Sequence, residues 1–392
     1  MDKLTNIKLL NPVSPVWREV VSENEYLLSD QAEKPDAIIV RSADMHEYAL
    51  EDSVQAVARA GVGVNNIPLD AYAEKGVVVF NSPGANANAV KELVIAALLM
   101  ASRDIAGGQV WAQSLKGEGE NVEKLVEKGK KAFVGPEIAG KTLGVIGLGA
   151  IGLLVANAAS ALGMNVLGYD PYISVDNAWK LSRAVKHAMS EDEVIEKSDY
   201  VTVHVPLTDE TRGKFNKALL SRMKKGAALI NFARGELAVP EDILEALESG
   251  QLRRYVCDFP TEKLLGVKNA VCLPHIGAST PESEDNCVRM VAVQLDAYLK
   301  TGAISHSVNY PDADPGRLVS PRVVVLHKNV PNVVNSITSV ISARNINIGN
   351  MLNKSRGQYA VTFLDLDDAP DDDLAGEIAN LNTVYRVRIL KP

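Results

Sequence analysis

Short apolar runs alternate with helix-like patterns over the first part of the chain. The runs at 7–10, 37–40 and 76–80 end in polar or glycine residues, which is typical of strands buried in a parallel sheet. The apolar segment 89–102 is long enough for a helix of about four turns. Strand and helix signals that alternate in this way predict an α/β architecture.

The same alternation continues through the middle of the chain and predicts a doubly wound sheet. Ser190 lies where it can cap the helix that follows it. The charged segment 112–136 shows weak periodicity, and we interpret it as an arm or loop. The expected strands are 143–146, 166–169, 200–205, 227–231 and 270–273, and the expected helices between them are 153–162, 190–197, 214–224 and 241–247.

A linker rich in Pro and Asp at 308–318 separates a third region from the rest of the chain. The pattern predicts four strands and two helices in the order β-α-β-β-α-β, which is the order of a small ferredoxin-like α+β fold. The expected strands are 323–326, 346–352, 358–366 and 384–390. We therefore expect a discontinuous first domain at 1–98 and 276–310, a second domain at 99–275 and a tail at 319–392.

A glycine-rich turn follows the expected strand 143–146. Gly147, Gly149 and Gly152 form Gly-x-Gly-x-x-Gly, and a helical segment comes next. In such motifs the first glycine permits a tight turn, the second lets the backbone approach a pyrophosphate, and the third lets the helix pack closely on the strand. Asp170 ends the next strand, where a carboxylate can accept hydrogen bonds from the adenosine ribose. Because no Arg or Lys directly follows Asp170, the motif favours NAD over NADP.

Composition limits the classes of protein that fit this chain of 392 residues, whose 46% hydrophobic content is sufficient for substantial cores. A net charge of −8 argues against a nucleic-acid partner. The three cysteines lack C-x-x-C spacing, which favours a reducing compartment with no disulfides and no metal site. The N-terminus has no signal-peptide pattern, and no apolar run approaches the roughly 18 residues of a membrane span. We expect a cytoplasmic protein.

Three charged residues that suit dehydrogenase chemistry lie at expected strand ends: Arg234, Glu262 and His275. Arginine can hold a substrate carboxylate through two parallel hydrogen bonds, histidine can move a proton near neutral pH, and glutamate can stabilise the imidazolium. By residue type alone a lone histidine after a proline is more often structural than catalytic. Similarly, Arg41 and Arg59 fit either an anion site or ordinary surface solubility.

Four motifs in order resemble the D-2-hydroxyacid dehydrogenase family. They are the glycine turn with Asp170, Asn-Phe-Ala-Arg-Gly-Glu at 231–236, Asp-Phe-Pro-Thr-Glu at 258–262, and Pro-His-Ile-Gly-Ala-Ser-Thr at 274–280. The resemblance runs from about 37 to 310. It implies a Rossmann-type doubly wound nucleotide domain and a flavodoxin-like discontinuous substrate domain. The tail from Arg322 is similar to the small ACT regulatory domain that members of this family often carry.

The resemblance also implies a role for each matching residue. Arg234 would bind the substrate carboxylate, His275 would be the proton donor and acceptor, and Glu262 would support His275. The implied NAD-binding residues are Gly147, Gly149, Ala150, Ile151, Gly152, Asp170, His204, Pro206, Thr211, Phe232, Ala233, Asp258, Gly277 and Ala278. The implied substrate-binding residues are Arg41, Ser42, Arg59, Gly63, Val64 and Asn86, and the implied effector residues are His327, Asn329 and Asn347.

The sequence departs from the family pattern at two places. The segment before Glu262 is one residue shorter than the common Asp-Val-Phe-x-x-Glu-Pro, and Lys263 replaces the proline. In the tail, Asn332 stands where glycine is usual, and asparagine tolerates the left-handed backbone conformation better than most residues.

Within the family, the resemblance is greatest to enzymes that oxidise 3-phospho-D-glycerate to 3-phosphohydroxypyruvate with NAD, the first step of phosphorylated serine biosynthesis. It implies a homodimer or homotetramer, with L-serine as an effector. Two alternatives stay open at this point. One is a dehydrogenase of another 2-hydroxy acid, and the other is a non-enzymatic NAD(H) or amino-acid sensor on the same scaffold.

Overall fold

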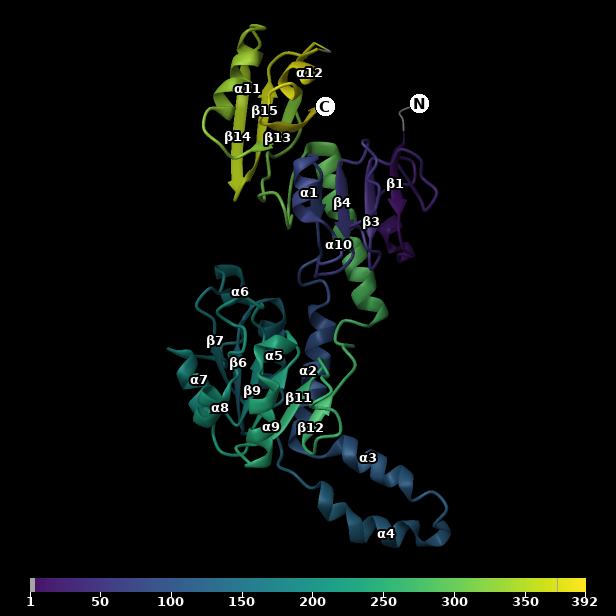
Figure 1. The fold of residues 1–392 in the computed structure, drawn as a ribbon, viewed down its shortest axis with the longest axis vertical. Helices are drawn as coiled ribbons and strands as arrows, with labels where there is room; N and C mark the ends of the chain where they lie inside the picture. Colours follow the sequence, from purple (N-terminus) through teal and green to yellow (C-terminus); the bar gives the residue numbers. More distant parts are fainter. Residues whose placement is uncertain (1–3, 372) are drawn as a thin grey trace. The chain divides into compact units, whose positions relative to one another are not determined.

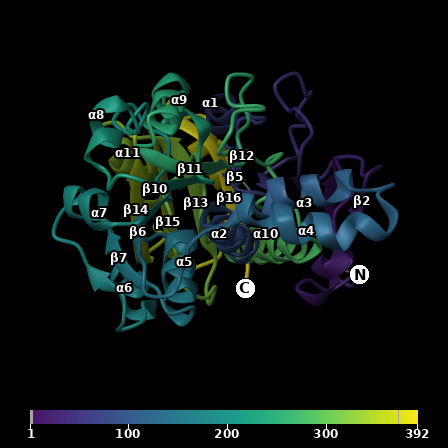
Figure 2. The ribbon, with the colours of Figure 1, turned by 90° about the horizontal axis from the view of Figure 1, so that it is seen from below.

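The computed structural model describes residues 4–371 and 373–392, which divide into two compact units. The first unit combines the chain up to Asn86 with Pro281–Pro392, and the second is Ala87–Thr280. Figures 1 and 2 trace the elements of both units.

A parallel seven-stranded sheet with the order β12-β11-β10-β9-β6-β7-β8 forms the second unit, as the doubly wound prediction requires. Its strand order reverses beside β6, and open α/β sheets bind ligands outside the carboxyl ends of the strands at such a point. The strands are β6 (Thr142–Ile146), β7 (Asn165–Tyr169), β8 (Lys186–His187), β9 (Tyr200–Val203), β10 (Ala227–Asn231), β11 (Leu252–Cys257) and β12 (Ala270–Cys272).

Apolar residues on successive positions of these strands pack into two separate buried clusters, as a sheet buried on both faces requires. The helices are α2 (Ala87–Ser102), α3 (Ile105–Ser114), α4 (Val122–Gly129), α5 (Ala150–Ala161), α6 (Val175–Lys180), α7 (Glu191–Lys197), α8 (Lys217–Arg222) and α9 (Pro240–Glu248). Ser190 caps α7 by accepting a hydrogen bond from the Glu193 N–H. Short 3-10 turns occur at Gly119–Asn121, Lys130–Phe133 and Gly235–Leu237.

The segment 112–136, which we interpreted as an arm or loop, contains helical structure, including all of α4. Its apolar residues Val122, Leu125 and Val126 have helical spacing, but no residue of α3 or α4 is buried. The charged and glycine residues around this short helix obscure its periodicity in the sequence, which explains the interpretation.

The first unit contains a parallel five-stranded sheet with the flavodoxin-like order β2-β1-β3-β4-β5. Its strands are β1 (Thr5–Leu9), β2 (Tyr26–Ser29), β3 (Ala37–Val40), β4 (Ala56–Arg59) and β5 (Val78–Phe80). The 3-10 helix η1 (Pro15–Glu19), α1 (Leu69–Glu74) and α10 (Pro281–Thr301) accompany the sheet. The sequence pattern missed β2, a short strand at the edge of the sheet.

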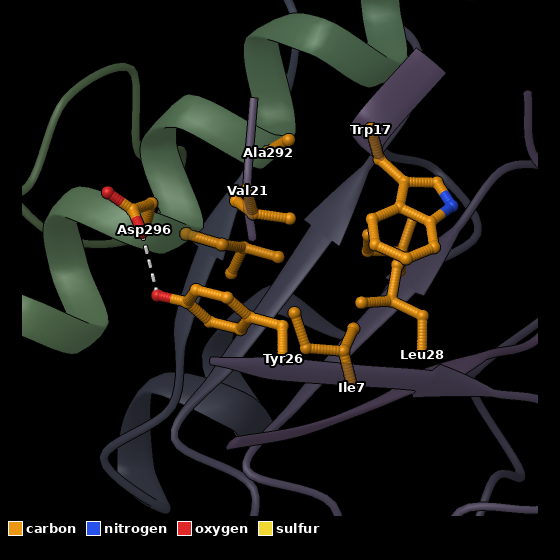
Figure 3. Close-up of a pocket in the computed structure, with 9 residues that line it drawn as sticks. Ile7, Trp17, Val21, Tyr26, Leu28, Ala292 and Asp296 are labelled. Atoms are coloured by element: carbon orange, nitrogen blue, oxygen red, sulfur yellow. Dashed lines mark hydrogen bonds between the residues drawn. The ribbon is translucent and has the colours of Figure 1, made fainter. Parts of the chain in front are cut away.

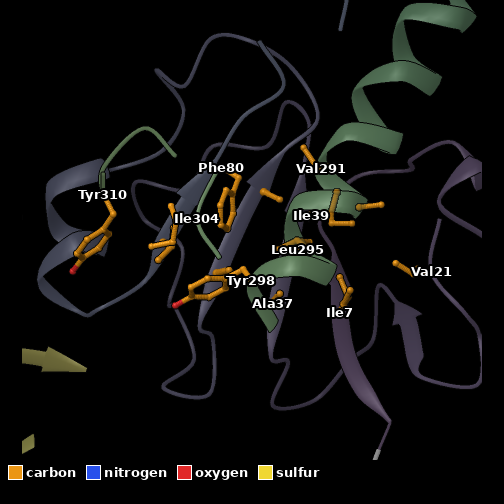
Figure 4. Close-up of a cluster of buried hydrophobic side chains, with 14 of the residues drawn as sticks. Ile7, Val21, Ala37, Ile39, Phe80, Val291, Leu295, Tyr298, Ile304 and Tyr310 are labelled. Carbon is orange, nitrogen blue, oxygen red and sulfur yellow. The ribbon is translucent and has the colours of Figure 1, made fainter. Parts of the chain in front are cut away.

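Residues from β1, β3, β5 and α10 meet in one buried cluster, which Figure 4 draws. Figure 3 shows a small hollow beside this core, where Tyr26 Oη donates to Asp296 Oδ1 over 2.8 Å. The volume of the hollow is about 10 Å³, which is close to the minimum for one water molecule. We therefore assign it to core packing and not to a ligand.

The tail follows the predicted β-α-β-β-α-β order and forms an antiparallel sheet, β14-β15-β13-β16. Asn332, at the start of its first helix, has φ +68, so asparagine adopts the left-handed conformation there. The elements are β13 (Arg322–Lys328), α11 (Val333–Ser342), β14 (Ile348–Arg356), β15 (Tyr359–Leu366), α12 (Leu374–Ala379) and β16 (Val384–Leu390).

The two faces of the tail sheet pack against different partners within the first unit. Val323 and Val325 pack with the helices α11 and α12, whereas Val324 and Phe363 share the buried cluster of Tyr298. Backbone carbonyls of the first unit accept hydrogen bonds from three tail arginines, Arg322, Arg386 and Arg388. These contacts join the tail to the five-stranded domain.

No single helix among the described residues has the length and apolar character to cross a membrane, although α2 and α3, taken together as a bent pair, meet those two criteria.

Candidate functional site

The glycine turn between β6 and α5 has the geometry that its three glycines predict. Gly147 has φ +89, and a Cβ there would lie 2.7 Å from the carbonyl oxygen of His204. A Cβ on Gly152 would lie 1.9 Å from the carbonyl oxygen of Gly147. In contrast, nothing lies within 4 Å of a Cβ placed on Gly149. The turn is therefore closed on its inner side and open at Gly149, which fits a pyrophosphate at the N-terminus of α5.

Alanine substitutions should separate these two roles. Gly152→Ala forces a methyl group into a carbonyl oxygen, so we expect it to destabilise the second unit by about 1–3 kcal/mol. Gly149→Ala meets no atom, and its φ of −67 suits alanine, so we expect an unchanged Tm but an NADH Kd raised about tenfold or more. Thermal unfolding and NADH fluorescence titration of the two variants measure these effects. Equal effects of both substitutions on Tm and Kd would contradict the assignment.

Asp170 follows β7 and is half-buried. Its two carboxylate oxygens accept hydrogen bonds from the Leu148 N–H and the Tyr172 N–H, both at 2.8 Å. These bonds orient the carboxylate beside the glycine turn while other lone pairs stay available. The position and chemistry of this side chain fit a ribose diol.

His204 lies just beyond β9, beside the same turn. Its Nε2 is 2.9 Å from Thr202 Oγ1, and its Nδ1 is buried with no hydrogen-bond partner in the described residues. Burial lowers the pKa of His204 from 6.5 to about 4, because the charged imidazolium loses its hydration. His204 is therefore neutral at pH 7.

A pH-dependent stability follows from this lowered pKa. Unfolding releases His204 to bind a proton below its ordinary pKa of 6.5, so the unfolded chain binds more protons there. The stabilisation is complete above that pH and is lost as pH falls toward 4, by up to about 3 kcal/mol. Thermal unfolding of the cofactor-free chain should show a smaller loss of Tm toward acid in His204→Asn than in the wild type. Parallel Tm curves for the two chains would contradict the prediction.

Arg234 follows β10 in a turn that a buried asparagine holds in place. Asn231 Nδ2 donates to the Arg234 carbonyl over 2.8 Å, and Asn231 Oδ1 accepts from the Ala233 N–H over 3.1 Å. The Arg234 guanidinium is exposed and donates to the Ala233 carbonyl over 2.7 Å. The sequence analysis did not assign a role to Asn231, although its place at the end of a buried strand was a signal.

The end of β11 carries Asp258, which is only 2% exposed. Burial raises the pKa of Asp258, and His275, the Gly277 N–H and Arg234 each oppose that rise. Its Oδ1 has no hydrogen-bond partner in the described part of the chain. A buried carboxylate within electrostatic reach of His275 and Arg234 is suited to stabilise a positive charge there.

His275 lies beyond β12, is exposed, and has the left-handed φ of +50. Its ring centroid is 4.7 Å from that of Phe259, at an interplanar angle of 50°. The carboxyl ends of β10, β11 and β12 thus bring Arg234, Asp258 and His275 to one edge of the sheet.

Glu262 is exposed and lines a surface hollow of about 570 Å³ together with Pro240, Thr261 and Lys263. Within the described residues, no hydrogen bond or ion pair joins Glu262 to His275. The role of Glu262 as the partner of His275 stays a prediction, and the electrostatic interaction between Asp258 and His275 favours Asp258.

Arg41 and Arg59 lie in the first unit, at the carboxyl ends of β3 and β4. Asn11 Oδ1 accepts from the backbone N–H groups of Arg41, Ser42 and Ala43 over 3.0, 3.0 and 3.1 Å. Arg59 Nε donates to the Arg41 carbonyl over 3.2 Å, and Arg41 forms an ion pair with Glu284. The structure therefore brings the two arginines together. Sequence reasoning did not identify Asn11 as the residue that shapes this loop.

The neighbouring loop 61–66 is held by Asn81, which follows β5 and is itself bonded by a side chain of α10. Asn81 Nδ2 donates to the Val62 carbonyl over 2.6 Å, and Gln294 Nε2 donates to the Asn81 carbonyl over 3.0 Å. Gly63 and Val64 are half-buried in this loop, and Asn86 is half-buried after β5.

The other predicted NAD-binding residues lie in loops of the second unit or in the first turn of α5. Thr211 Oγ1 donates to the Pro206 carbonyl over 2.7 Å in the loop after β9. Phe232 and Gly277 are buried, whereas Ala150 and Ala278 are exposed, and Ile151 and Ala233 are half-buried.

The three predicted effector residues differ in how exposed they are. His327 is 2% exposed, and its ring nitrogens contact the Lys328 carbonyl and Thr362 Oγ1, both at 2.8 Å. Asn329 and Asn347 are exposed and donate to the Gly357 carbonyl and to Asp367 Oδ2 over 2.9 and 2.6 Å. A ligand that bonds to His327 must therefore displace an internal hydrogen bond.

The sheet order and the glycine turn define a doubly wound nucleotide-binding domain. Residues 95–277 match the family described as D-isomer specific 2-hydroxyacid dehydrogenase, NAD binding domain, and form an NAD-binding domain. The match confirms the resemblance to D-2-hydroxyacid dehydrogenases that the motifs predicted.

Curated relatives carry the same resemblance. The D-3-phosphoglycerate dehydrogenase of Methanocaldococcus jannaschii is 36% identical over 80% of this chain and 59% of the relative. The corresponding enzyme of Bacillus subtilis is 34% identical over 79% of this chain and 58% of the relative. The chain thus spans less than two thirds of the length of these relatives.

Solved structures share the fold. The structure of NAD⁺-bound 3-phosphoglycerate dehydrogenase from Entamoeba histolytica aligns with a TM-score of 0.59 and 25% identity, covering 78% of this chain and 99% of that one. The cofactor-free D-mandelate dehydrogenase of Rhodotorula graminis aligns with a TM-score of 0.66 and 23% identity, covering 80% of this chain and 100% of that one, and supports the fold alone.

Proposed function

We propose that this chain oxidises 3-phospho-D-glycerate to 3-phosphohydroxypyruvate, with NAD as the cofactor. The observation that carries the proposal is the meeting of Arg234, Asp258 and His275 at the carboxyl ends of β10, β11 and β12. The names of the curated relatives support the choice of substrate.

Each side chain supplies one part of the reaction. NAD, when bound, provides the acceptor for the hydride from C2 of the substrate. His275 takes the proton of the C2 hydroxyl, and Asp258 stabilises the imidazolium that results. Arg234 binds the substrate carboxylate and polarises the forming carbonyl, a task that suits its planar guanidinium. Arg41 and Arg59 bind the phosphate.

Steady-state kinetics in the reductive direction test the proposal. The decrease in NADH absorbance is followed with 3-phosphohydroxypyruvate, hydroxypyruvate, pyruvate and 2-ketoglutarate. We expect kcat/KM to be about tenfold or more higher for the phosphorylated compound, because only that compound has a group for Arg41 and Arg59. Turnover of another oxo acid alone would contradict the proposed substrate but would support the proposed dehydrogenase mechanism. NADH binding without turnover of any of the four would favour a sensor.

We propose further that the tail is a regulatory domain whose effector is L-serine, and that the protein is a cytoplasmic homodimer or homotetramer. The exposed amides of Asn329 and Asn347 and the buried imidazole of His327 support the choice of the effector region. A serine titration of the preferred reaction tests the regulation, and sedimentation analysis tests the assembly. Full activity at saturating serine would remove the effector role.

A further inference from the structure

Two cysteines of the second unit face one another across neighbouring strands. Cys257 ends β11, Cys272 ends β12, and the two are register partners in this parallel pair. Side chains directly opposite one another in a sheet leave it on the same face, and the two Sγ atoms are 3.9 Å apart. Neither thiol has a role in the proposed reaction.

The surroundings of the pair do not fit a metal centre. A structural zinc site needs four ligands, and none of the described residues form a group of three or more His, Cys, Asp or Glu side chains that could hold an ion. The pair packs in the apolar cluster under β10 and β11. Two isolated thiols at this distance are suited to join with one another.

The two thiols differ in reactivity and access. Cys257 is fully buried, whereas Cys272 is half-buried and lines an open hollow of about 390 Å³ with Leu264, Leu265 and Asn269. The Cys257 thiol donates a hydrogen bond to Cys272 Sγ, which lowers the pKa of the Cys272 thiol. The thiolate is the nucleophile in thiol oxidation, so Cys272 is the sulfur that meets an oxidant first.

We propose that Cys257 and Cys272 form a redox modification site, at which a peroxide joins them in a disulfide. The Cys272 thiolate attacks one peroxide oxygen, the O–O bond breaks, and hydroxide leaves as water after taking a proton. The sulfur of Cys257 then attacks the resulting sulfenic acid, the S–O bond breaks, and a second water leaves with the remaining thiol proton. Two thiols lose two electrons in total and hydrogen peroxide gains them.

Such a disulfide would affect the residues that follow each cysteine. Asp258 and Phe259 come directly after Cys257, and His275 lies three residues beyond Cys272. Closing the sulfurs from 3.9 Å to a bond of about 2.05 Å requires one or both cysteine side chains to move at the two strand ends. Since a misplacement of about 1 Å can cost about 100-fold in rate, we expect kcat to fall at least about tenfold. This consequence, unlike the disulfide itself, rests on the proposed function.

The test treats the full chain with hydrogen peroxide, quenches it with an alkylating reagent under unfolding conditions, and measures the intact mass. All three cysteines are free in the untreated chain, so the reduced protein takes three labels. We expect the oxidised protein to take one label and to yield a peptide pair that links Cys257 to Cys272. The Cys287→Ala variant, whose only cysteines are Cys257 and Cys272, should take no label after oxidation. The Cys272→Ser variant should form no internal disulfide.

Kinetics on the same samples test the effect on turnover. The oxidised wild type should lose activity with the preferred oxo acid and regain it with dithiothreitol, whereas Cys272→Ser should resist the treatment. Three labels after oxidation, or a sulfinic acid at Cys272 without a linked peptide, would contradict the proposed disulfide. A linked peptide with unchanged kcat would overturn only the effect on turnover. The mass readout decides the site even if none of the four oxo acids is reduced.

Discussion

Replacement of His275 by alanine is expected to lower kcat by about 10³-fold and to leave the Kd for NADH within about twofold of the wild type. The imidazole is the only titratable side chain among the described residues that we assign to proton transfer. Its removal leaves hydride transfer without a proton donor or acceptor. The ring is exposed and packs beside Phe259, so its loss creates no cavity in the core. The effect should therefore be on turnover and not on folding.

Stopped-flow or steady-state reduction of 3-phosphohydroxypyruvate measures kcat, and NADH fluorescence titration measures cofactor binding. His187→Ala is the matched control, because His187 is also exposed but lies at the far edge strand β8. This control should retain wild-type kcat. A kcat for His275→Ala within about threefold of the control would exclude His275 as the proton-transfer residue.

Asp258→Asn should have the second-largest effect, with kcat about 10²-fold lower and a nearly unchanged Kd for NADH. The asparagine keeps the shape of the side chain but removes the charge that faces His275. Burial raises the pKa of Asp258, so in the wild type the carboxylate takes a proton at a higher pH than an ordinary aspartate. The wild type should therefore lose kcat on the acid side of its pH profile, and this loss should be absent from Asp258→Asn.

Glu262→Gln is the matched comparison, because it removes the same charge from the carboxylate that the family pattern assigns to His275. We expect it to change kcat by less than about threefold, since Glu262 lies at an exposed hollow. Asp258→Glu, which restores a carboxylate, should recover part of the rate. The opposite order, with Glu262→Gln strongly impaired and Asp258→Asn active, would return the role to Glu262.

The prediction of the nucleotide domain succeeded because its signals are local. Two positions of the turn require glycine and so can be recognised in the sequence. Gly147 has φ +89, and a Cβ on Gly152 would lie 1.9 Å from a carbonyl oxygen. The prediction of the tail's fold succeeded for a similar reason, because its six elements have clear periodicity and follow the β-α-β-β-α-β order. The segment around α4 was misinterpreted because this helix is short, none of its residues is buried, and charged residues surround the three apolar positions.

Local sequence signals did not predict several contacts of the candidate site. Asn11 and Asn231 each hold a turn by bonding to backbone groups, and asparagine is so common in loops that neither its type nor its position revealed these contacts. A motif also could not decide whether Asp258 or Glu262 is the partner of His275, because both carboxylates occur within five residues. Only the burial of one and the exposure of the other distinguishes them.

By itself, the sequence determined the class of fold, the resemblance to a family and the types of side chain available for chemistry, because these follow from periodicity, glycine geometry and residue chemistry. The tertiary structure alone decided which side chains meet. Strand register places Cys257 opposite Cys272, and the shared carboxyl edge of three strands places Arg234, Asp258 and His275 together. Electrostatic and covalent interactions fall off over a few ångströms, whereas these residues are 15 to 41 positions apart in the chain, so only folding brings them within reach.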